Sequence, residues 1–254
     1  MSLSTYRYDG SFEGLLSAFA EARLEGAAGP VFTPASAVEG GLLWAAREVP
    51  VCPASAAALW RDLVSAGGAE AGRTLTSAWL AEEPDLEAAL YGYCCLTLER
   101  RQCLDAWAAQ PAIGAVLAAA RRVGHEVHRF QGILRFAETR SGWYYAACEP
   151  DHNIIVLLAP HFVGRLGDQR WAIHDCRRDL VVCWDGQELR PGRAPSSSSE
   201  GSAVGPALSE AEVATQSQWR RYHRHIAIDS RRNPRLQRRC LPRRYWPYLT
   251  EMQG

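Results

Sequence analysis

The second half of the chain gathers residue types that perform acid–base or metal chemistry. Five of the seven histidines lie between positions 125 and 174, and carboxylates lie among them. Neutral imidazole binds a metal or accepts a proton while carboxylate supplies negative charge, so the mixture suits a divalent metal site or general acid–base catalysis. The candidate catalytic residues are His128, Glu149, Asp151, His152, His174 and Asp175.

The same residues also fit a purely structural interpretation. No pair has His-x-x-x-His spacing, so neither a metal nor its identity follows from the pattern, and no motif supports a cofactor. Asp151 is an adequate helix cap, and Arg177-Arg178 could pair with Glu149 or Asp175 in an internal salt-bridge network. The spacings leave both interpretations open.

A basic, aromatic segment lies near the C-terminus. Between Arg220 and Arg244 there are ten arginines and one acidic residue, Asp229. Guanidinium groups bind phosphates bidentately and aromatic rings stack on exposed bases, so this mixture predicts contact with nucleic acid. The alternative is that the arginines pair with acids of the body, with Trp219 and Trp246 as core anchors. The predicted nucleic-acid-binding residues are Arg220, Arg221, Arg224, Arg231, Arg232, Asn233, Arg235, Arg238, Arg239, Arg243, Arg244, Tyr245 and Trp246.

A largely helical N-terminal half precedes both groups. A short strand is expected over 6–9, followed by a helix that Ser11 caps and whose apolar residues recur at helical spacing. Alanine-rich stretches predict further helices over 54–66, 74–82, 85–104 and 113–123, which are separated by Gly67-Gly68, Pro84 and Pro111.

The second half predicts a small, mainly antiparallel sheet with one helix. Strands are expected over 133–137 and 143–148, joined at Ser141-Gly142, and over 171–174 and 180–184. The helix between these pairs is capped by Asp151 or Asn153 and kinked by Pro160. Asp151-His152 then lies at a strand-to-helix junction and His174-Asp175 at a strand end, where side chains often project into a cleft. The fold class is α+β.

Composition divides the chain into a body and an appendage. The body is expected over 1–190, and a flexible linker rich in Pro, Gly, Ser and Ala follows over 191–208. A basic, helical C-terminal arm over 209–254 begins at Ser209, with a helix over 213–228 that ends before Asn233-Pro234.

The overall composition excludes several mechanisms. The 254 residues carry no formal net charge and contain no lysine, which rules out a Schiff-base lysine and a P-loop lysine. No apolar run approaches the roughly 20 residues that span a bilayer, and the N-terminus lacks a signal-peptide stretch, so a cytoplasmic protein without membrane contact is expected. The eight cysteines have no zinc or iron–sulfur spacing and are expected to be reduced thiols.

Nearly the whole chain carries an ordered set of short sequence blocks, namely Tyr8-Asp9-Gly10-Ser11-Phe12-Glu13-Gly14, His128-Arg129-Phe130-Gln131-Gly132, Glu149-Pro150-Asp151-His152-Asn153-Ile154, Leu158-Ala159-Pro160-His161-Phe162, Ile173-His174-Asp175, Arg177-Arg178, Ser230-Arg231-Arg232-Asn233-Pro234-Arg235-Leu236-Gln237 and Pro242-Arg243-Arg244-Tyr245-Trp246. Together these blocks resemble an uncharacterised bacterial family labelled as DNA repair or DNA metabolism proteins. The resemblance implies no catalytic residues. It implies DNA as a partner, a radical-SAM protein as a second partner, and similarity to the N-terminal part of some uracil-DNA-glycosylase-like fusion proteins.

Three functional hypotheses follow from these observations. The first is a DNA-binding accessory of a radical-SAM repair or modification enzyme, in which the arm holds DNA and the body docks the partner. The second is a metal-assisted or acid–base enzyme that acts on nucleic acid through the histidine–carboxylate cluster. The third is a protein-interaction module whose arm contacts no nucleic acid.

Overall fold

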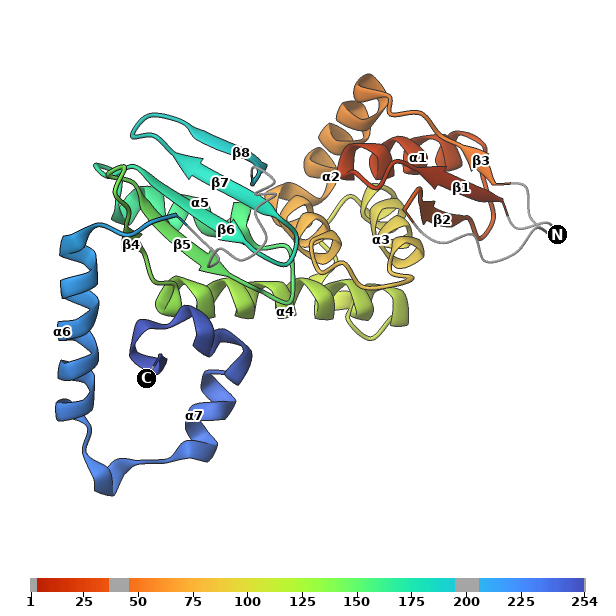
Figure 1. The fold of residues 1–254 in the computed structure, drawn as a ribbon. Helices are drawn as coiled ribbons and strands as arrows, with labels where there is room; N and C mark the ends of the chain where they lie inside the picture. The colour runs from red at the N-terminus through yellow and green to blue at the C-terminus, as the bar shows by residue number, and fades with distance from the viewer. Residues whose placement is uncertain (1–3, 37–45, 195–205, 254) are drawn as a thin grey trace. The chain divides into compact units, whose positions relative to one another are not determined.

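The computed structural model describes residues 4–36, 46–194 and 206–253 and shows an α+β protein, as the sequence predicts (Figure 1). The chain forms two compact units, residues 1–124 (unit 1) and 125–254 (unit 2). The predicted arm, 209–254, therefore belongs to the same unit as the larger sheet. None of the helices in the described ranges combines the length and apolar character needed to cross a bilayer.

Unit 1 begins with a small parallel sheet. Its central strand β1 (Thr5–Tyr8) pairs with β2 (Val31–Pro34) on one side and β3 (Arg47–Glu48) on the other. Helix α1 (Phe12–Leu24) connects β1 to β2, and the hydroxyl of Ser11 caps it by accepting a hydrogen bond from the Gly14 N–H at 2.9 Å. The predicted first strand and Ser11 cap are confirmed, whereas β2 and β3 were not predicted.

The remainder of unit 1 is helical. Helix α2 (Pro53–Trp79) consists of two helical segments that meet at a kink at Gly68, whose φ of 75° is left-handed. The break that the sequence predicts at Gly67-Gly68 is therefore confirmed, although the second segment begins earlier than residue 74. Helix α3 (Glu87–Arg100), the short 3₁₀ helix η1 (Asp105–Trp107) and α4 (Pro111–Ile133) follow. Helix α4 is longer than predicted and continues into unit 2.

Unit 2 contains a five-stranded sheet in the order β4-β5-β6-β7-β8. The strands are β4 (Ala137–Glu138), β5 (Tyr144–Cys148), β6 (Trp171–Asp175), β7 (Leu180–Trp184) and β8 (Leu189–Arg193). Only β5 and β6 are parallel, joined by helix α5 (Ile155–Arg165), and the other pairs are antiparallel. The predicted mainly antiparallel sheet with one helix is confirmed.

Three sequence predictions in this unit are wrong in detail. The strand expected over 133–137 is mostly absent, because α4 continues to Ile133 and β4 has only two residues. Asp151 and Asn153 do not cap α5, because its cap is Ile154, which makes no side-chain cap bond. The linker expected from residue 191 begins too early, because Pro191 pairs with Val182 in β8. The predicted linker's residues 195–205 lie outside the described ranges.

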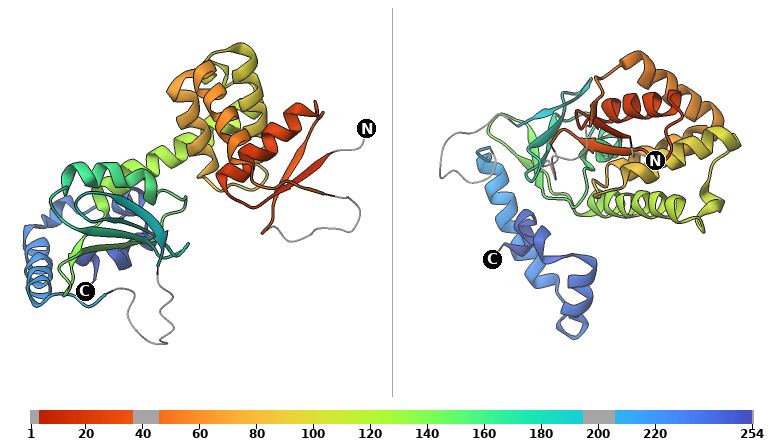
Figure 2. Two further views of the ribbon diagram at one scale, coloured as in Figure 1. Left: turned by 90° about the horizontal axis from the view of Figure 1, so that it is seen from above. Right: turned by 90° about the vertical axis from the view of Figure 1, so that its right-hand side faces the viewer.

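The C-terminal arm is built from short helices. Ser209 caps α6 (Glu210–Ile226), and Asn233 caps α7 (Pro234–Cys240), with Pro234 in its first turn. The 3₁₀ helices η2 (Asp229–Arg231), η3 (Arg243–Tyr248) and η4 (Thr250–Met252) complete it. Figures 1 and 2 show α6 and α7, in blue, extending away from the sheet of unit 2. The chain then comes back to this sheet at η3, which contacts β5.

Helix–helix packing in unit 1 depends on one glycine. A Cβ placed on Gly67 would lie 2.5 Å from both Ala71 Cβ and Thr97 Cγ2, so α2 and α3 approach too closely there for any side chain. We expect Gly67→Ala to destabilise the protein by about 1–3 kcal/mol through overpacking. The matched variant is Gly92→Ala in α3, where an added Cβ would meet no atom within 4 Å, and its unfolding free energy should rise by up to about 1 kcal/mol. Urea unfolding of both variants measures the difference, and equal effects would contradict the packing argument.

Candidate functional site

A buried carboxylate, Glu126 on α4, organises the polar cluster of unit 2. It accepts hydrogen bonds from the backbone N–H groups of Asp151 at 2.8 Å and His152 at 2.9 Å. It also contacts the His152 ring Nδ1 at 2.5 Å and accepts a hydrogen bond from the Tyr245 hydroxyl at 2.9 Å. Burial alone would raise the pKa of Glu126, but these hydrogen bonds outweigh burial and lower it.

Asp151 and His152 contact α4, the C-terminal arm and the arginines that follow β6. His152 pairs with Glu126, and the Asp151 carboxylate forms an ion pair with Arg244 of the arm. The Asp151 carbonyl accepts hydrogen bonds from Arg177 and Arg178. Both predicted site residues therefore hold the loop before α5 and the arm together.

A second group lies at the end of β6. The buried Asp175 carboxylate accepts backbone hydrogen bonds from Arg177 at 3.0 Å and Arg178 at 3.2 Å, and pairs with the Arg178 guanidinium at 2.9 Å. His174 contacts the Tyr145 hydroxyl through Nδ1 at 2.5 Å and lies 3.4 Å from Asp179 through Nε2. These contacts match the predicted internal network of arginines and carboxylates.

Of the remaining two candidates, Glu149 follows Cys148, which pairs with Asp175, whereas His128 is separate from both groups. His128 is exposed on α4 and makes no hydrogen bond or ion pair with the described residues. Burial and the nearby Glu149 carboxylate raise the pKa of the Tyr248 phenol. Within the described ranges, no group of three or more His, Cys, Asp or Glu side chains is placed to hold a metal ion.

Glu126 was missed at the sequence level, although its position carries a signal. The buried residues of α4 include Val116, Ala119, Val123 and Phe130. Glu126 continues their alternating spacing of three and four residues, so it lies on the same buried face of the helix. A carboxylate on the apolar face of a helix requires hydrogen-bond donors. That requirement could have singled out Glu126.

The end of the arm is packed into unit 2. Tyr245 is 1% exposed and packs edge-on against Phe130, with ring centroids 5.0 Å apart, and Leu249 is also buried. Glu251 accepts hydrogen bonds from Arg135 at 2.6 Å and from the indole of Trp219 at 3.1 Å. Among the predicted nucleic-acid-binding residues, Tyr245 is therefore an internal anchor.

Asn233 and Trp246 also have structural contacts. Asn233 caps α7 by accepting a hydrogen bond from the Leu236 N–H, and the Trp246 indole donates to the Leu241 carbonyl, each at 3.0 Å. Trp246 is half-buried, with the Arg243 guanidinium 5.4 Å from its ring centre. These contacts stabilise the conformation of the arm itself.

In contrast, most of the arginines that are predicted to bind nucleic acid, including Arg232, are exposed to solvent. Within the part of the chain that the structure describes, eight of the predicted arginines form no ion pair: Arg220, Arg221, Arg224, Arg231, Arg235, Arg238, Arg239 and Arg243. The arm therefore carries positive charge that the described acidic residues leave unneutralised.

Exposed apolar side chains lie among these arginines. On α6, Trp219 and Tyr222 are stacked with centroids 5.7 Å apart and remain 41% and 54% exposed. Ile226, Ile228 and Leu236 are about half exposed as well. Apolar groups exposed together and bordered by charge mark an interaction surface.

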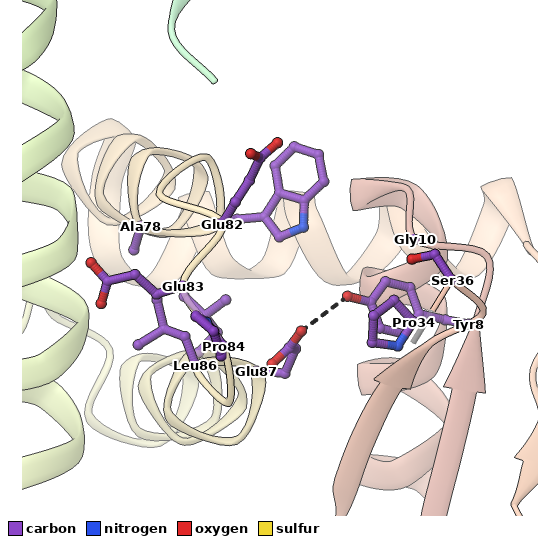
Figure 3. Close-up of a pocket in the computed structure, with 12 residues that line it drawn as sticks. Tyr8, Gly10, Pro34, Ser36, Ala78, Glu82, Glu83, Pro84, Leu86 and Glu87 are labelled. Carbon is purple, nitrogen blue, oxygen red and sulfur yellow. Dashed lines mark hydrogen bonds between the residues drawn. The ribbon is translucent and has the colours of Figure 1, made fainter. Parts of the chain in front are cut away.

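Unit 1 contains a cavity of about 310 Å³ at the carboxyl ends of β1 and β2 (Figure 3). Tyr8, Trp79 and the carboxylates of Glu82, Glu83 and Glu87 line it, and the Tyr8 hydroxyl donates to Glu87 at 3.3 Å. Its acidic lining disfavours phosphate groups, so this cavity is a poor candidate for contact with nucleic acid.

The fold and surface define an α+β protein whose second unit carries an arginine-rich, partly apolar arm. Residues 84–251 match a protein family described as a domain of unknown function, DUF4130. The chain belongs to this family, and the matched region includes α3, α4 and the described residues of unit 2 up to Glu251. No curated protein and no solved structure matches the chain.

The anchoring of the arm through Tyr245 is testable by stability. Replacing Tyr245 with Phe removes the hydrogen bond that the hydroxyl donates to the buried Glu126 carboxylate and the one that it accepts from Arg244, and should cost about 1.5–3 kcal/mol of unfolding free energy. Tyr222→Phe is the matched control, because the Tyr222 ring is exposed and the variant should unfold like the wild type. Urea titration followed by circular dichroism compares them. Equal stability of Tyr245→Phe and the wild type would show that the hydroxyl contacts do not help to anchor the arm.

The lowered pKa of Glu126 predicts a pH dependence with a definite sign. A carboxylate whose pKa is lower in the folded state stabilises the fold above its unfolded pKa of about 4.5, and this contribution is lost as pH falls through the folded pKa. Glu126→Gln should be less stable than the wild type at pH 7, and the difference should shrink toward pH 3. A difference that is constant between pH 7 and pH 3 would contradict this.

Proposed function

We propose that the chain binds DNA through the C-terminal arm. The observation that carries the proposal is the row of exposed arginines without ion pairs among the described residues, interleaved with the stacked rings of Trp219 and Tyr222. Planar guanidinium groups match phosphate oxygens, and exposed aromatic faces stack on bases that are not paired in a duplex. Single-stranded or locally opened DNA therefore suits the arm better than a closed duplex.

The polar cluster favours an accessory role over catalysis. Glu126, Asp151 and Asp175 already accept hydrogen bonds from the chain's own backbone or pair with its arginines. A catalytic carboxylate would have to break such bonds to take a proton or bind a metal. The cluster instead supports the arm that carries the arginines.

A radical-SAM enzyme as the partner of this accessory rests on the family resemblance described above. The test is co-purification of the full-length chain with the radical-SAM protein of the same system, followed by size-exclusion chromatography. Association at micromolar concentration supports the accessory role. Separate elution of the two proteins, with DNA binding retained, would remove this partner and leave the DNA contact in place.

The DNA contact itself predicts a salt-dependent affinity. The logarithm of the association constant for a single strand should fall linearly with the logarithm of the salt concentration. The magnitude of the slope should be about 0.7 for each phosphate that the protein neutralises. Replacing Arg235, Arg238 and Arg239 with Gln should weaken binding and reduce the slope by about 2. Fluorescence anisotropy across a salt series measures both quantities.

Substitution suits this test better than truncation, because Tyr245 and Leu249 are buried and their removal would disturb unit 2. The matched control replaces Arg23, Arg61 and Arg121, three exposed arginines of unit 1, with Gln. This control should keep the wild-type affinity and slope. If the control weakens binding as much as the arm variant does, the arm is not the contact surface.

A further inference from the structure

Unit 2 contains a cavity of about 510 Å³ between the C-terminal ends of α4 and α5 and the start of β5. Its apolar wall includes the rings of Phe136, Tyr144 and Phe162, and the first and last of these pack at 4.9 Å between centroids. Its volume lies within the range of about 300–1,000 Å³ typical of small-molecule sites. The aromatic wall suits a flat ligand.

Several polar groups of the cavity are free to bind a ligand. The Gln131 amide, the Tyr144 hydroxyl and the Arg165 guanidinium form no hydrogen bond or ion pair with the described residues. Asp168 contacts only the Gln169 amide, at 3.2 Å, among those residues. Hydrogen-bond donors and acceptors beside an aromatic wall match the edge and the face of a nucleobase.

The cavity is linked to the C-terminal arm through Arg135 and Glu251. Arg135 lines it, and the same guanidinium donates to the Gly132 and Ile133 carbonyls at the end of α4 and to Glu251. Glu251 in turn holds the indole of Trp219, next to the exposed arginines of α6. A strand bound along α6 would therefore pass close to the cavity.

We propose that this cavity receives one unstacked base of a single-stranded nucleic acid whose backbone lies on the arm. The base stacks on the aromatic wall, its edge meets Gln131 and Asp168, and Arg165 at the rim faces a flanking phosphate. The proposal rests on the proposed function and adds to it the part of the ligand that enters unit 2. Taking an already unpaired base avoids the free energy of opening a duplex.

Gly132 offers a way to block the cavity without altering the arm. It is exposed at the cavity rim, and a Cβ placed on it meets no atom within 4 Å. Gly132→Trp should fill the cavity. Gly124→Trp is the matched control, because Gly124 is exposed on the same helix, has the same open space and does not line the cavity.

The experiment compares two probes by fluorescence anisotropy, a single-stranded oligonucleotide and the same backbone with abasic sites throughout. The wild type should bind the intact strand more tightly. Gly132→Trp should reduce that preference at least fivefold and leave the affinity for the abasic strand within twofold, whereas Gly124→Trp should change neither. If Gly132→Trp fails to fold, Gln131→Ala, which breaks no internal hydrogen bond, should also reduce the preference for the intact strand and leave the affinity for the abasic strand unchanged.

A photo-cross-link locates the base. A strand that carries 5-iodouracil should form an adduct with Tyr144 or Phe136, and Gly132→Trp should abolish it. Adducts on Trp219 and Tyr222 alone, or a preference for intact strand that Gly132→Trp does not change, would overturn the base site while the arm proposal stands. Failure of the wild type to bind either probe would overturn the proposed function itself.

Discussion

The arrangement of unit 2 depends on the hydrogen bonding of one buried carboxylate, Glu126. A charge removed from water is tolerated only where donors replace its hydration. Here the donors are two backbone N–H groups of the loop before α5, the ring of His152 and the hydroxyl of Tyr245. Helix α4, that loop and the end of the arm are consequently fixed to one another at a single point.

This constraint divides the arm into two parts with different roles. Its end, from η3 to η4, is fixed by Tyr245, Leu249 and the ion pair between Arg244 and Asp151. Helices α6 and α7 have no buried residue and carry most of the exposed arginines. Because η3 returns the chain to unit 2, the basic helices are held between two attached ends. A surface held in this way loses less conformational entropy on binding than a free tail.

The sequence predicted the features that depend on local patterns. The α+β class, the Ser11 cap, the strands β5, β6 and β7 and the start of α6 follow from capping residues and apolar alternation, and all are confirmed. The small parallel sheet was missed because β3 is only Arg47–Glu48, with no apolar pattern to detect. Strand β8 contains Pro191 and Gly192, which favour loops, and forms only as an edge strand beside β7.

The sequence predicted those parts of the candidate site that depend on local patterns, but not its contacts between distant residues. The pattern identified Asp151, His152, His174 and Asp175 as polar residues at strand and loop ends, and the structure places them in two hydrogen-bonded groups. It could not reveal that Tyr245 reaches Glu126, because the two residues are 119 positions apart. Contacts at that separation depend on tertiary packing.

Hydrogen–deuterium exchange of the full-length chain, with and without single-stranded DNA, tests the central claim most directly. The account predicts that amides of η3 and of the Asp151–His152 loop exchange slowly in the free chain, because the Glu126 contacts fix them. It predicts that added DNA protects α6, α7 and the rim of the 510 Å³ cavity, and that high salt abolishes this protection. Protection confined to the acidic cavity of unit 1, or no change in the arm at low salt, would contradict it.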